Sequence, residues 1–314
     1  MLNVGIIGSL AAIERHASAL ARIQDIRITG RWITDGEQGS AADAESGVTC
    51  MSPSQVIGNA DALIIAAGGS FCEQVAISAL RSARHVFIYP FIIQSLADAT
   101  QLNKLAREAN VILRVGRTGN DNVKNLLRAL PDATEINIIE LQHDYQARGN
   151  HTGARNMFDA LLADLEVINS LVKARVISIK AKGLCMLASE ADIVSARLEF
   201  DNGCAVNYNC NLVAAQNGFT GTLVLKNRIL KYNFGSGELS SWFVQHQSAP
   251  VKTPFFLENI RIEKTDSLTG ELADFFDLIR SGPAFLSMND NGFEPYILTD
   301  RILEKVMKTL VRCS

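Results

Sequence analysis

Residues 1–20 read MLNVGIIGSLAAIERHASAL, and this opening decides the fold. A short apolar run, Val4 to Ile7, ends at Gly8, and a helical pattern follows directly. This pattern is typical of the first strand, turn and helix of a dinucleotide-binding unit. Such a unit usually has further glycines two and five residues after the first, where this chain has Leu10 and Ile13. The opening predicts a nucleotide-type fold and leaves open whether a nucleotide still binds.

The composition indicates a well-packed globular protein. The 314 residues are 47% hydrophobic and 20% charged, which suits two domains that each bury a core. A net charge of −3 gives no reason to expect nucleic acid or an anionic membrane as a partner. No apolar run approaches the roughly 18 residues of a membrane helix, and no signal-peptide pattern is present. The six cysteines lack zinc or redox spacing, so we expect reduced thiols, no metal site and a cytoplasmic location.

The chain up to residue 118 alternates short apolar strands with helical patterns, which predicts a parallel sheet covered by helices. The expected strands are Asn3–Ile7, Arg27–Ile33, Ala62–Ala66, His85–Ile88 and Val111–Val115, and the expected helices are Ala12–Ile23, Glu73–Ser82 and Leu96–Ala109. Four of the strands are nearly all apolar, as expected where both faces are buried. We therefore predict an α/β, doubly wound Rossmann-type domain over residues 1–118.

Residues 119–314 follow a different pattern, which predicts a second, α+β domain. A strand is expected at 133–144 (ATEINIIELQHD) and an amphipathic helix at 157–172 (MFDALLADLEVINSLV). Long alternating runs follow at 176–187, 192–212 and 220–234, separated by turn signals. Helices at Leu268–Ser281 and Pro295–Val311 close the chain and pack either within this domain or back on the first. The pattern predicts a largely antiparallel open sheet.

Several segments, in order and over nearly the whole chain, resemble the Gfo/Idh/MocA family (glucose–fructose oxidoreductase, inositol dehydrogenase and relatives). GIIG…RHASAL is similar to the family's opening strand, turn and helix. The resemblance extends to DALIIA (61–66), EQVAISALRSARHVFIYP (73–90), VILRVGRTGNDNV (111–123), ARLEFDNGCAVNYN (196–209) and the closing helices. It implies a Rossmann domain, an NAD or NADP cofactor, and a sugar or polyol-like substrate.

The resemblance places the cofactor at the turn after the first strand. Gly8 would make the bend, and Ser9 and Leu10 would begin a helix whose N-terminal N–H groups and dipole favour a phosphate. The side chains of Leu10 and Ile13 are expected to obstruct the usual backbone cradle.

Two further edges belong to the predicted cofactor site. The second strand should end on an acid for the ribose hydroxyls, but the aligned residue is Ile33, with Asp35 two residues later. Arg31 would suit a ribose phosphate, although a lone arginine on a strand is typically solvated. Gly68 and Gly69 follow the third strand, either as a ligand-binding edge or as a flexible turn. The cofactor candidates are therefore Gly8, Ser9, Leu10, Arg31, Asp35, Gly68 and Gly69.

The resemblance also implies a catalytic lysine in an E-K-P motif, which this chain lacks. Residues 87–91 are FIYPF, so Tyr89 is the candidate substitute, as a proton donor or a substrate contact. The alternative is a tyrosine that half-buries its ring at a strand end and exposes its hydroxyl. Without help, a tyrosine is a poor acid at neutral pH.

The third part of the family site is a helix carrying an aspartate and a histidine. In DALLADLE (159–166), helical spacing places Asp159, Ala163 and Glu166 on one face. Asp159 matches the family's acid, but Ala163 stands where the histidine would be, and alanine cannot accept a proton. The two carboxylates either hold a polar ligand or pair with Arg155 and Lys173 on a solvated face.

His143, Asp144 and Tyr145, at a strand end, are the candidate replacements for the lost catalytic groups. The catalytic candidates are therefore Tyr89, Asp159 and His143. Two function classes stay open: an NAD- or NADP-dependent oxidoreductase with unusual residues, or an inactive homologue that binds a small ligand or a partner subunit. An assembly role would require an exposed apolar patch from residues 220–234 and Trp242. We expect a homo-oligomer, a dimer or tetramer formed through the second-domain sheet.

Overall fold

The computed structural model describes residues 1–34, 50–89, 92–116, 123, 126–127, 135–146, 157–187, 190–244, 255–261, 268–282 and 292–312. The chain divides into two compact units. The first comprises Met1–Gly119 and Asp266–Tyr296, and the second comprises Asn120–Thr265 and Ile297–Ser314.

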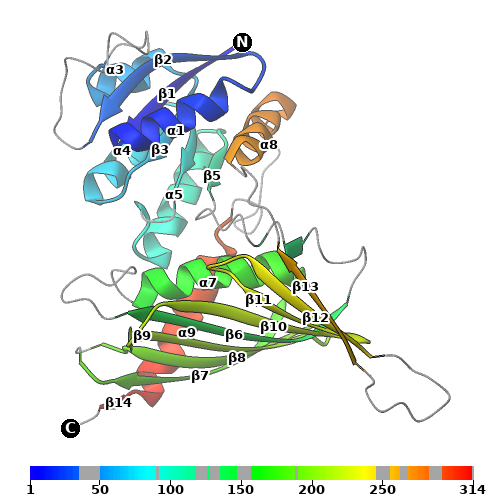
Figure 1. The fold of residues 1–314 in the computed structure, drawn as a ribbon. Coiled ribbons are helices and arrows are strands. Elements are labelled where there is room, and N and C mark those ends of the chain that lie inside the picture. The colour runs from blue at the N-terminus through cyan, green and yellow to red at the C-terminus, as the bar shows by residue number, and fades with distance from the viewer. Residues whose placement is uncertain are drawn as a thin grey trace. The chain divides into compact units, whose positions relative to one another are not determined.

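A five-stranded parallel sheet forms the centre of the first unit (Figure 1). Its strands lie in the order β2-β1-β3-β4-β5, so the order reverses between β1 and β3. Sheets of this kind bind ligands at the carboxyl ends of the strands beside such a reversal. The predicted doubly wound sheet is confirmed. Its strands are β1 (Leu2–Gly8), β2 (Ile26–Ile33), β3 (Ala62–Ala66), β4 (His85–Ile88) and β5 (Leu113–Val115).

Helices cover this sheet, and α1 (Leu10–Leu20), α3 (Pro53–Asn59) and α5 (Leu96–Glu108) begin at side-chain caps. Ser9 caps α1, and Ser95 caps α5. Helix α4 (Ser70–Arg81) follows β3. Helix α3 was not predicted from the sequence, because its seven residues are too short to show an apolar period. It begins at a capping box, in which the Ser52 and Gln55 side chains each accept a hydrogen bond from the other residue's backbone N–H.

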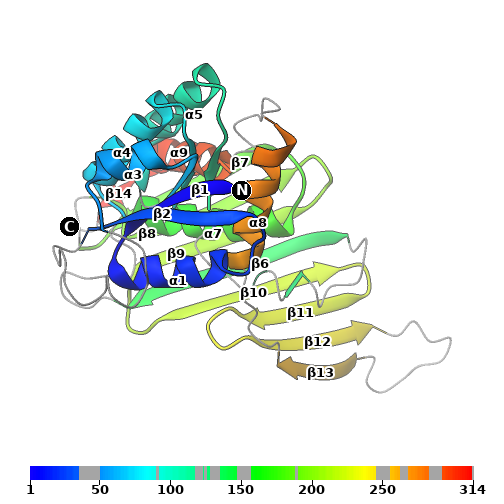
Figure 2. The same ribbon diagram turned by 90° about the horizontal axis from the view of Figure 1, so that it is seen from above.

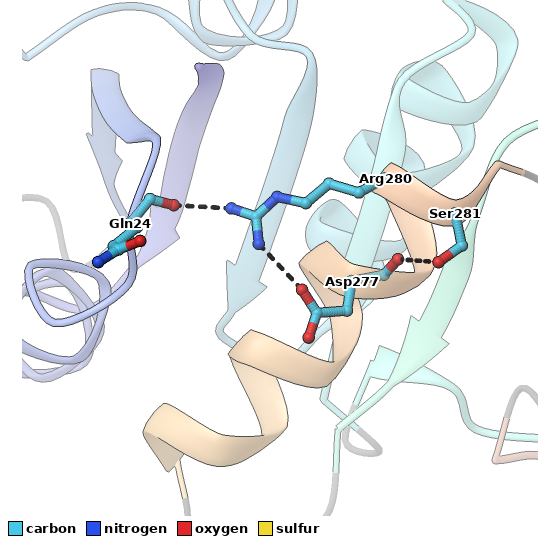
Figure 3. A network of polar contacts seen from close by, with 4 residues as sticks. All are labelled: Gln24, Asp277, Arg280 and Ser281. Atoms are coloured by element: carbon cyan, nitrogen blue, oxygen red, sulfur yellow. Dashed lines mark hydrogen bonds and ion pairs between the residues drawn. The ribbon is translucent and has the colours of Figure 1, made fainter.

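Helix α8 (Leu268–Ser281) completes the first unit, although the second unit's sheet precedes it in the chain. Its Phe275 and Phe276 are fully buried in the same core as Ile6 and Phe87. Figure 2 shows α8 beside α1. The Arg280 guanidinium donates to the Gln24 carbonyl at 2.7 Å and pairs with Asp277 at 2.9 Å (Figure 3). Of the two packing alternatives for this closing helix, the structure shows the return to the first unit.

The second unit is built on a nine-stranded sheet with the order β13-β12-β11-β10-β6-β9-β8-β7-β14. Among these strands, the β6–β9 and β7–β14 pairings are parallel and the others antiparallel, so the predicted, largely antiparallel sheet is confirmed. Strands β12 and β13 were not predicted. The strands are β6 (Ile136–Gln146), β7 (Val176–Cys185), β8 (Ile193–Phe200), β9 (Ala205–Ala214), β10 (Gly218–Leu225), β11 (Arg228–Asn233), β12 (Glu238–Val244), β13 (Phe255–Arg261) and β14 (Val311–Arg312).

One face of this sheet packs against α7 (Met157–Leu171) and the part of α9 (Glu294–Thr309) that belongs to this unit (Figure 1). The alternating apolar positions of residues 220–234 point into this core, where Leu223, Leu230 and Tyr232 are fully buried. The prediction that they supply an exposed apolar patch is therefore wrong. These apolar side chains are buried because α7 covers that face of the sheet, and the apolar side of a half-buried strand faces the covering layer.

Within the described parts of the chain, none of the helices is both long enough and apolar enough to cross a membrane.

Candidate functional site

The turn after β1 is the first candidate site, and its geometry depends on Gly8. A Cβ at this position would lie 3.1 Å from the Ala66 carbonyl oxygen at the end of β3. Ser9 then caps α1 by accepting a hydrogen bond from the Ala12 N–H at 3.3 Å, and the Ile13 N–H donates to the Ser9 carbonyl. The backbone N–H groups of Leu10 and Ala11 lie at the start of the helix, before the residues whose N–H groups make these two hydrogen bonds. They are the groups that a phosphate would meet at the positive end of the helix.

The two side chains that replace the usual glycines pack inward. Ile13 is 2% exposed in the first unit's core, and Leu10 packs against the same core from a partly buried position. The obstruction expected from these side chains is therefore smaller than the sequence alone suggests.

The loop after β3 forms the neighbouring edge. Gly68 is exposed, and Gly69 precedes α4 with φ +102°, a conformation that favours glycine. No side chain caps α4 at Gly69. Next to this end, the Phe71 ring lies 4.9 Å from the Trp32 ring, measured between centroids, and Phe71 is 46% exposed. An exposed aromatic surface therefore adjoins the carboxyl edge of the sheet.

The end of β2 differs from the sequence-based expectation. Arg31 is only 3% exposed, so the expectation of a solvated arginine is wrong; it lies within the sheet, opposite Ile6 of β1. Ile33, where an acid for the ribose hydroxyls was expected, is buried in the core, and its side chain offers no polar atom there. Asp35 lies outside the described residues.

Tyr89 follows β4, and its hydroxyl lies 2.9 Å from Nε2 of His16 on α1. Nδ1 of His16 donates to the Ala12 carbonyl at 2.5 Å. In a neutral imidazole, Nε2 is therefore unprotonated and accepts a hydrogen bond from the Tyr89 hydroxyl. Burial lowers the pKa of His16, which favours that neutral form. Burial, and secondly the Glu271 carboxylate, raises the pKa of Tyr89. The geometry gives Tyr89 a structural contact and makes it a poorer acid than a free tyrosine.

On α7, the face predicted from helical spacing is present. Asp159, Ala163 and Glu166 are all partly buried, whereas Leu161 and Leu165 are fully buried in the core. Arg155, the predicted partner of the carboxylates, lies outside the described residues.

A buried polar cluster lies under α7 in the second unit, formed by His143, Asp164 and Tyr208. Nδ1 of His143 on β6 lies 2.6 Å from Oδ1 of Asp164 on α7. The Tyr208 hydroxyl on β9 donates to the other carboxylate oxygen, Oδ2, at 2.7 Å. Asp164 is 1% exposed, while the His143 side chain is 17% exposed. Two donors on one buried carboxylate are what makes such a charge tolerable in a core.

Aromatic rings fix the plane of the His143 imidazole. Tyr145 and Phe219 each stack with it at 4.0 Å between centroids. Burial and then the Asp164 charge raise the pKa of Tyr145 and Tyr208, and the same causes raise the pKa of Cys210 to about 12. The neighbours of His143 therefore keep their protons at neutral pH.

Asp164 and Tyr208 were not predicted from the sequence. The sequence signal for this cluster is a polar side chain at a position that the periodicity assigns to the core. Asp164 lies among the apolar residues of LLADLEVI, and His143 continues the inward-facing series of Ile139 and Leu141. Of the three catalytic candidates, the structure places Asp159 and His143 in the second unit and Tyr89 in the first. No group of three or more His, Cys, Asp or Glu side chains that could hold a metal ion occurs in the described part of the chain.

Comparison with known proteins identifies the first unit. The family described as "Oxidoreductase family, NAD-binding Rossmann fold" matches residues 2–117. The N-terminal domain belongs to the Gfo/Idh/MocA oxidoreductase family. This confirms the resemblance drawn from the sequence.

The relatives of this chain are distant. UDP-N-acetylglucosamine 3-dehydrogenase from Acidithiobacillus ferrooxidans is 22% identical over 284 residues, which is 88% of each chain. A solved structure of that enzyme superposes with a TM-score of 0.77 at 18% identity, covering 98% of both chains. Levoglucosan dehydrogenase in complex with NADH gives 0.75 at 14% identity, covering 98% of both. Biliverdin reductase from Synechocystis, with biliverdin and NADP+, gives 0.71 at 18%, covering 98% of this chain and 99% of that one. At these identities the structural likeness establishes the fold.

Proposed function

We propose that this chain is an NAD(P)-dependent oxidoreductase that acts on a hydroxyl group of a sugar or polyol-like substrate. The observation that carries the proposal is the carboxyl edge of β1 and β3. There Gly8 allows the close turn, and the N–H groups of Leu10 and Ala11 stand at the start of α1. The family match over residues 2–117 supports a dinucleotide at this edge.

The residues present suit such a cofactor. The pyrophosphate would meet the turn at Gly8 and Ser9 and the first N–H groups of α1, with Gly68 and Gly69 on the adjoining edge. The flat base would lie against Phe71 and Trp32, and Asp35 is proposed for the ribose hydroxyls. We leave Arg31 out of this set because its side chain is buried. When bound, NAD(P) would supply the hydride acceptor of the reaction.

The substrate class rests on relatives rather than on a contact in this chain. Proteins of similar fold act on UDP-N-acetylglucosamine and levoglucosan, and one of their structures holds L-sorbose. Asp159, on the partly buried face of α7, is proposed to bind a substrate hydroxyl. We propose that Tyr89 and Ala163 stand where the family has its lysine and helix histidine, so that proton transfer would use a different group of this chain.

Cofactor binding is the deciding experiment. The chain has two tryptophans, so in Trp242→Phe the remaining Trp32 reports on the cofactor edge. We expect NADH or NADPH to quench Trp32 and to bind with a micromolar Kd by calorimetry. Gly8→Ala should weaken binding at least tenfold, because its Cβ would press on the Ala66 carbonyl. Gly58→Ala, whose Cβ would meet open space on α3, should bind like the wild type.

Turnover is then assayed with UDP-N-acetylglucosamine, levoglucosan and L-sorbose as probes. If neither dinucleotide binds at protein concentrations well above micromolar, the oxidoreductase proposal is wrong. The second candidate, an inactive homologue that binds a small ligand, would then be favoured by Ala163 in place of the family's histidine.

A further inference from the structure

We infer that Asp164, supported by Tyr208, holds the His143 proton on Nδ1, so that Nε2 of His143 is the proton acceptor in the proposed oxidation. This inference rests on the proposed function for its reaction, but the hydrogen bonds that carry it stand by themselves. Asp164 and Tyr208 are positioning residues, since they act through the imidazole.

The hydrogen bonds determine which imidazole nitrogen carries the proton. Asp164 Oδ1 lies 2.6 Å from Nδ1 of His143, and Oδ2 already accepts the Tyr208 hydroxyl. A carboxylate only accepts hydrogen bonds, so Nδ1 must donate. In a neutral imidazole, Nε2 then carries the lone pair. Within the described part of the chain, Nε2 of His143 makes no hydrogen bond that would occupy this lone pair.

The ring is also held against rotation. Tyr145, two residues along β6, and Phe219, directly opposite on β10, stack on the imidazole at 4.0 Å each. The angle between the His143 and Phe219 planes is only 6°. An imidazole held between two rings and tied at Nδ1 keeps Nε2 in one direction, which is what a proton acceptor in catalysis requires.

A purely structural role explains this cluster less well. Removing a carboxylate from water is costly, and well-packed apolar residues often fill such a position at least as stably. Asp164 follows Ala163, the position at which the resemblance to the family implies a histidine. The two side chains differ in exposure: Asp164 is buried, whereas 17% of the His143 side chain is exposed. Among the described residues, the other titratable groups near the imidazole are Tyr145, Tyr208 and Cys210; Asp159 acts on Tyr145, and Asp144 acts on Cys210.

The proposed step balances as an ordinary alcohol oxidation. As the C–H bond of the substrate carbinol breaks, its hydrogen and electron pair would go as hydride to the oxidised NAD(P) of the proposed function. The O–H bond breaks, its proton passes to Nε2 of His143, and the remaining electron pair completes the C=O bond. The proton then leaves the imidazolium to solvent. His143 neither gains nor loses electrons.

The tautomer of His143 is measured directly by long-range ¹H–¹⁵N correlation at about pH 8.5, where an ordinary imidazole is neutral. His143→Gln identifies the His143 signals among the five histidines. We expect the Nδ1–H form in the wild type, and a shift toward Nε2–H in Asp164→Leu, which removes the acceptor at similar volume. An Nε2–H form in the wild type would overturn the inference, whatever the variants do.

Asp144→Asn is the matched control. Asp144 is a carboxylate adjacent to His143 in sequence, but it lies on the opposite face of β6 and bonds to Gln142. Its substitution should leave the His143 tautomer unchanged. Tyr208→Phe keeps the aromatic ring and leaves the contact between Asp164 and Nδ1 of His143, so it should retain the Nδ1–H form. If Asp164→Leu fails to fold, the wild-type spectrum still tests the inference.

Turnover provides the second arm, using the probe substrate that the cofactor-dependent screen identifies. We expect His143→Gln to lower kcat by about 10²- to 10⁴-fold, with the Kd for NADH unchanged. An unchanged kcat would exclude His143 as the proton acceptor while leaving the oxidoreductase intact. Failure of the wild type to bind NADH would instead refute the proposed function, and the tautomer measurement would still stand.

Discussion

The imidazole of His16 and the hydroxyl of Tyr89 are 2.9 Å apart, which ties α1 to the end of β4. The two rings meet edge to face at 5.5 Å between centroids. His16 is 3% exposed and uses both nitrogens, since Nδ1 donates to Ala12 and Nε2 faces Tyr89. The pair therefore acts as a brace inside the first unit.

Tyr89→Phe tests whether this hydroxyl stabilises the first unit through His16 or takes part in catalysis. The substitution keeps the ring that packs on Phe87 but leaves Nε2 of His16 without this donor. We expect the free energy of unfolding to fall by about 1–3 kcal/mol, the cost of a buried polar group that loses its partner. Chemical denaturation measures this loss. Turnover should survive; a loss of kcat with an unchanged Kd for NADH would instead make Tyr89 the proton donor.

The stability of the first unit should depend on pH through His16 and His85. Burial lowers the pKa of both His16 and His85 in the folded chain. The unfolded chain then binds more protons as the pH falls below about 6.5, so stability is present above that value and is lost toward acid. In urea titrations between about pH 7.5 and about pH 5.5, His16→Gln should show a shallower loss than the wild type. Equal slopes in the two proteins would contradict this assignment.

Helix α8 should matter more through its apolar face than through its polar anchor. Phe275→Ala empties a fully buried position and should cost about 3–5 kcal/mol. Arg280→Ala loses a hydrogen bond and an ion pair at a side chain that is 39% exposed, and should cost about 1 kcal/mol or less. Trp32 fluorescence in the Trp242→Phe background follows unfolding of the first unit. The reverse order of effects would mean that α8 is held by Arg280.

Gly69 and Gly58 form a matched pair for backbone strain. Neither would give an added Cβ a close contact, but only Gly69 has a positive φ, of 102°. Gly69→Ala should therefore destabilise the chain by about 1–3 kcal/mol. Gly58→Ala, within α3, should be neutral or stabilising by up to about 1 kcal/mol. Thermal unfolding of both variants gives the comparison, and equal shifts would show that strain at Gly69 is not the cause.

Most strands of the first domain could be predicted well because they are short, nearly all apolar and mostly buried. Residues 62–66 and 85–88 form strands with the predicted bounds. Helix α3 was missed, since its signal lies in a capping box rather than in a period. The outward patch was predicted wrongly, because alternation along β10 and β11 shows that one face is apolar but not which face α7 covers.

The sequence by itself determined the fold class, the turn at Gly8 and the family, because local pattern and spacing carry that information. Tertiary structure decided the partners of the polar side chains. It buried Arg31 and placed the Tyr89 hydroxyl within hydrogen-bond distance of His16. It also brought Asp164 to within 2.6 Å of His143, which lies 21 residues away in the chain. Periodicity shows which face of an element is apolar. Only the assembled layers determine which two polar atoms meet there, and a buried carboxylate requires that such partners exist.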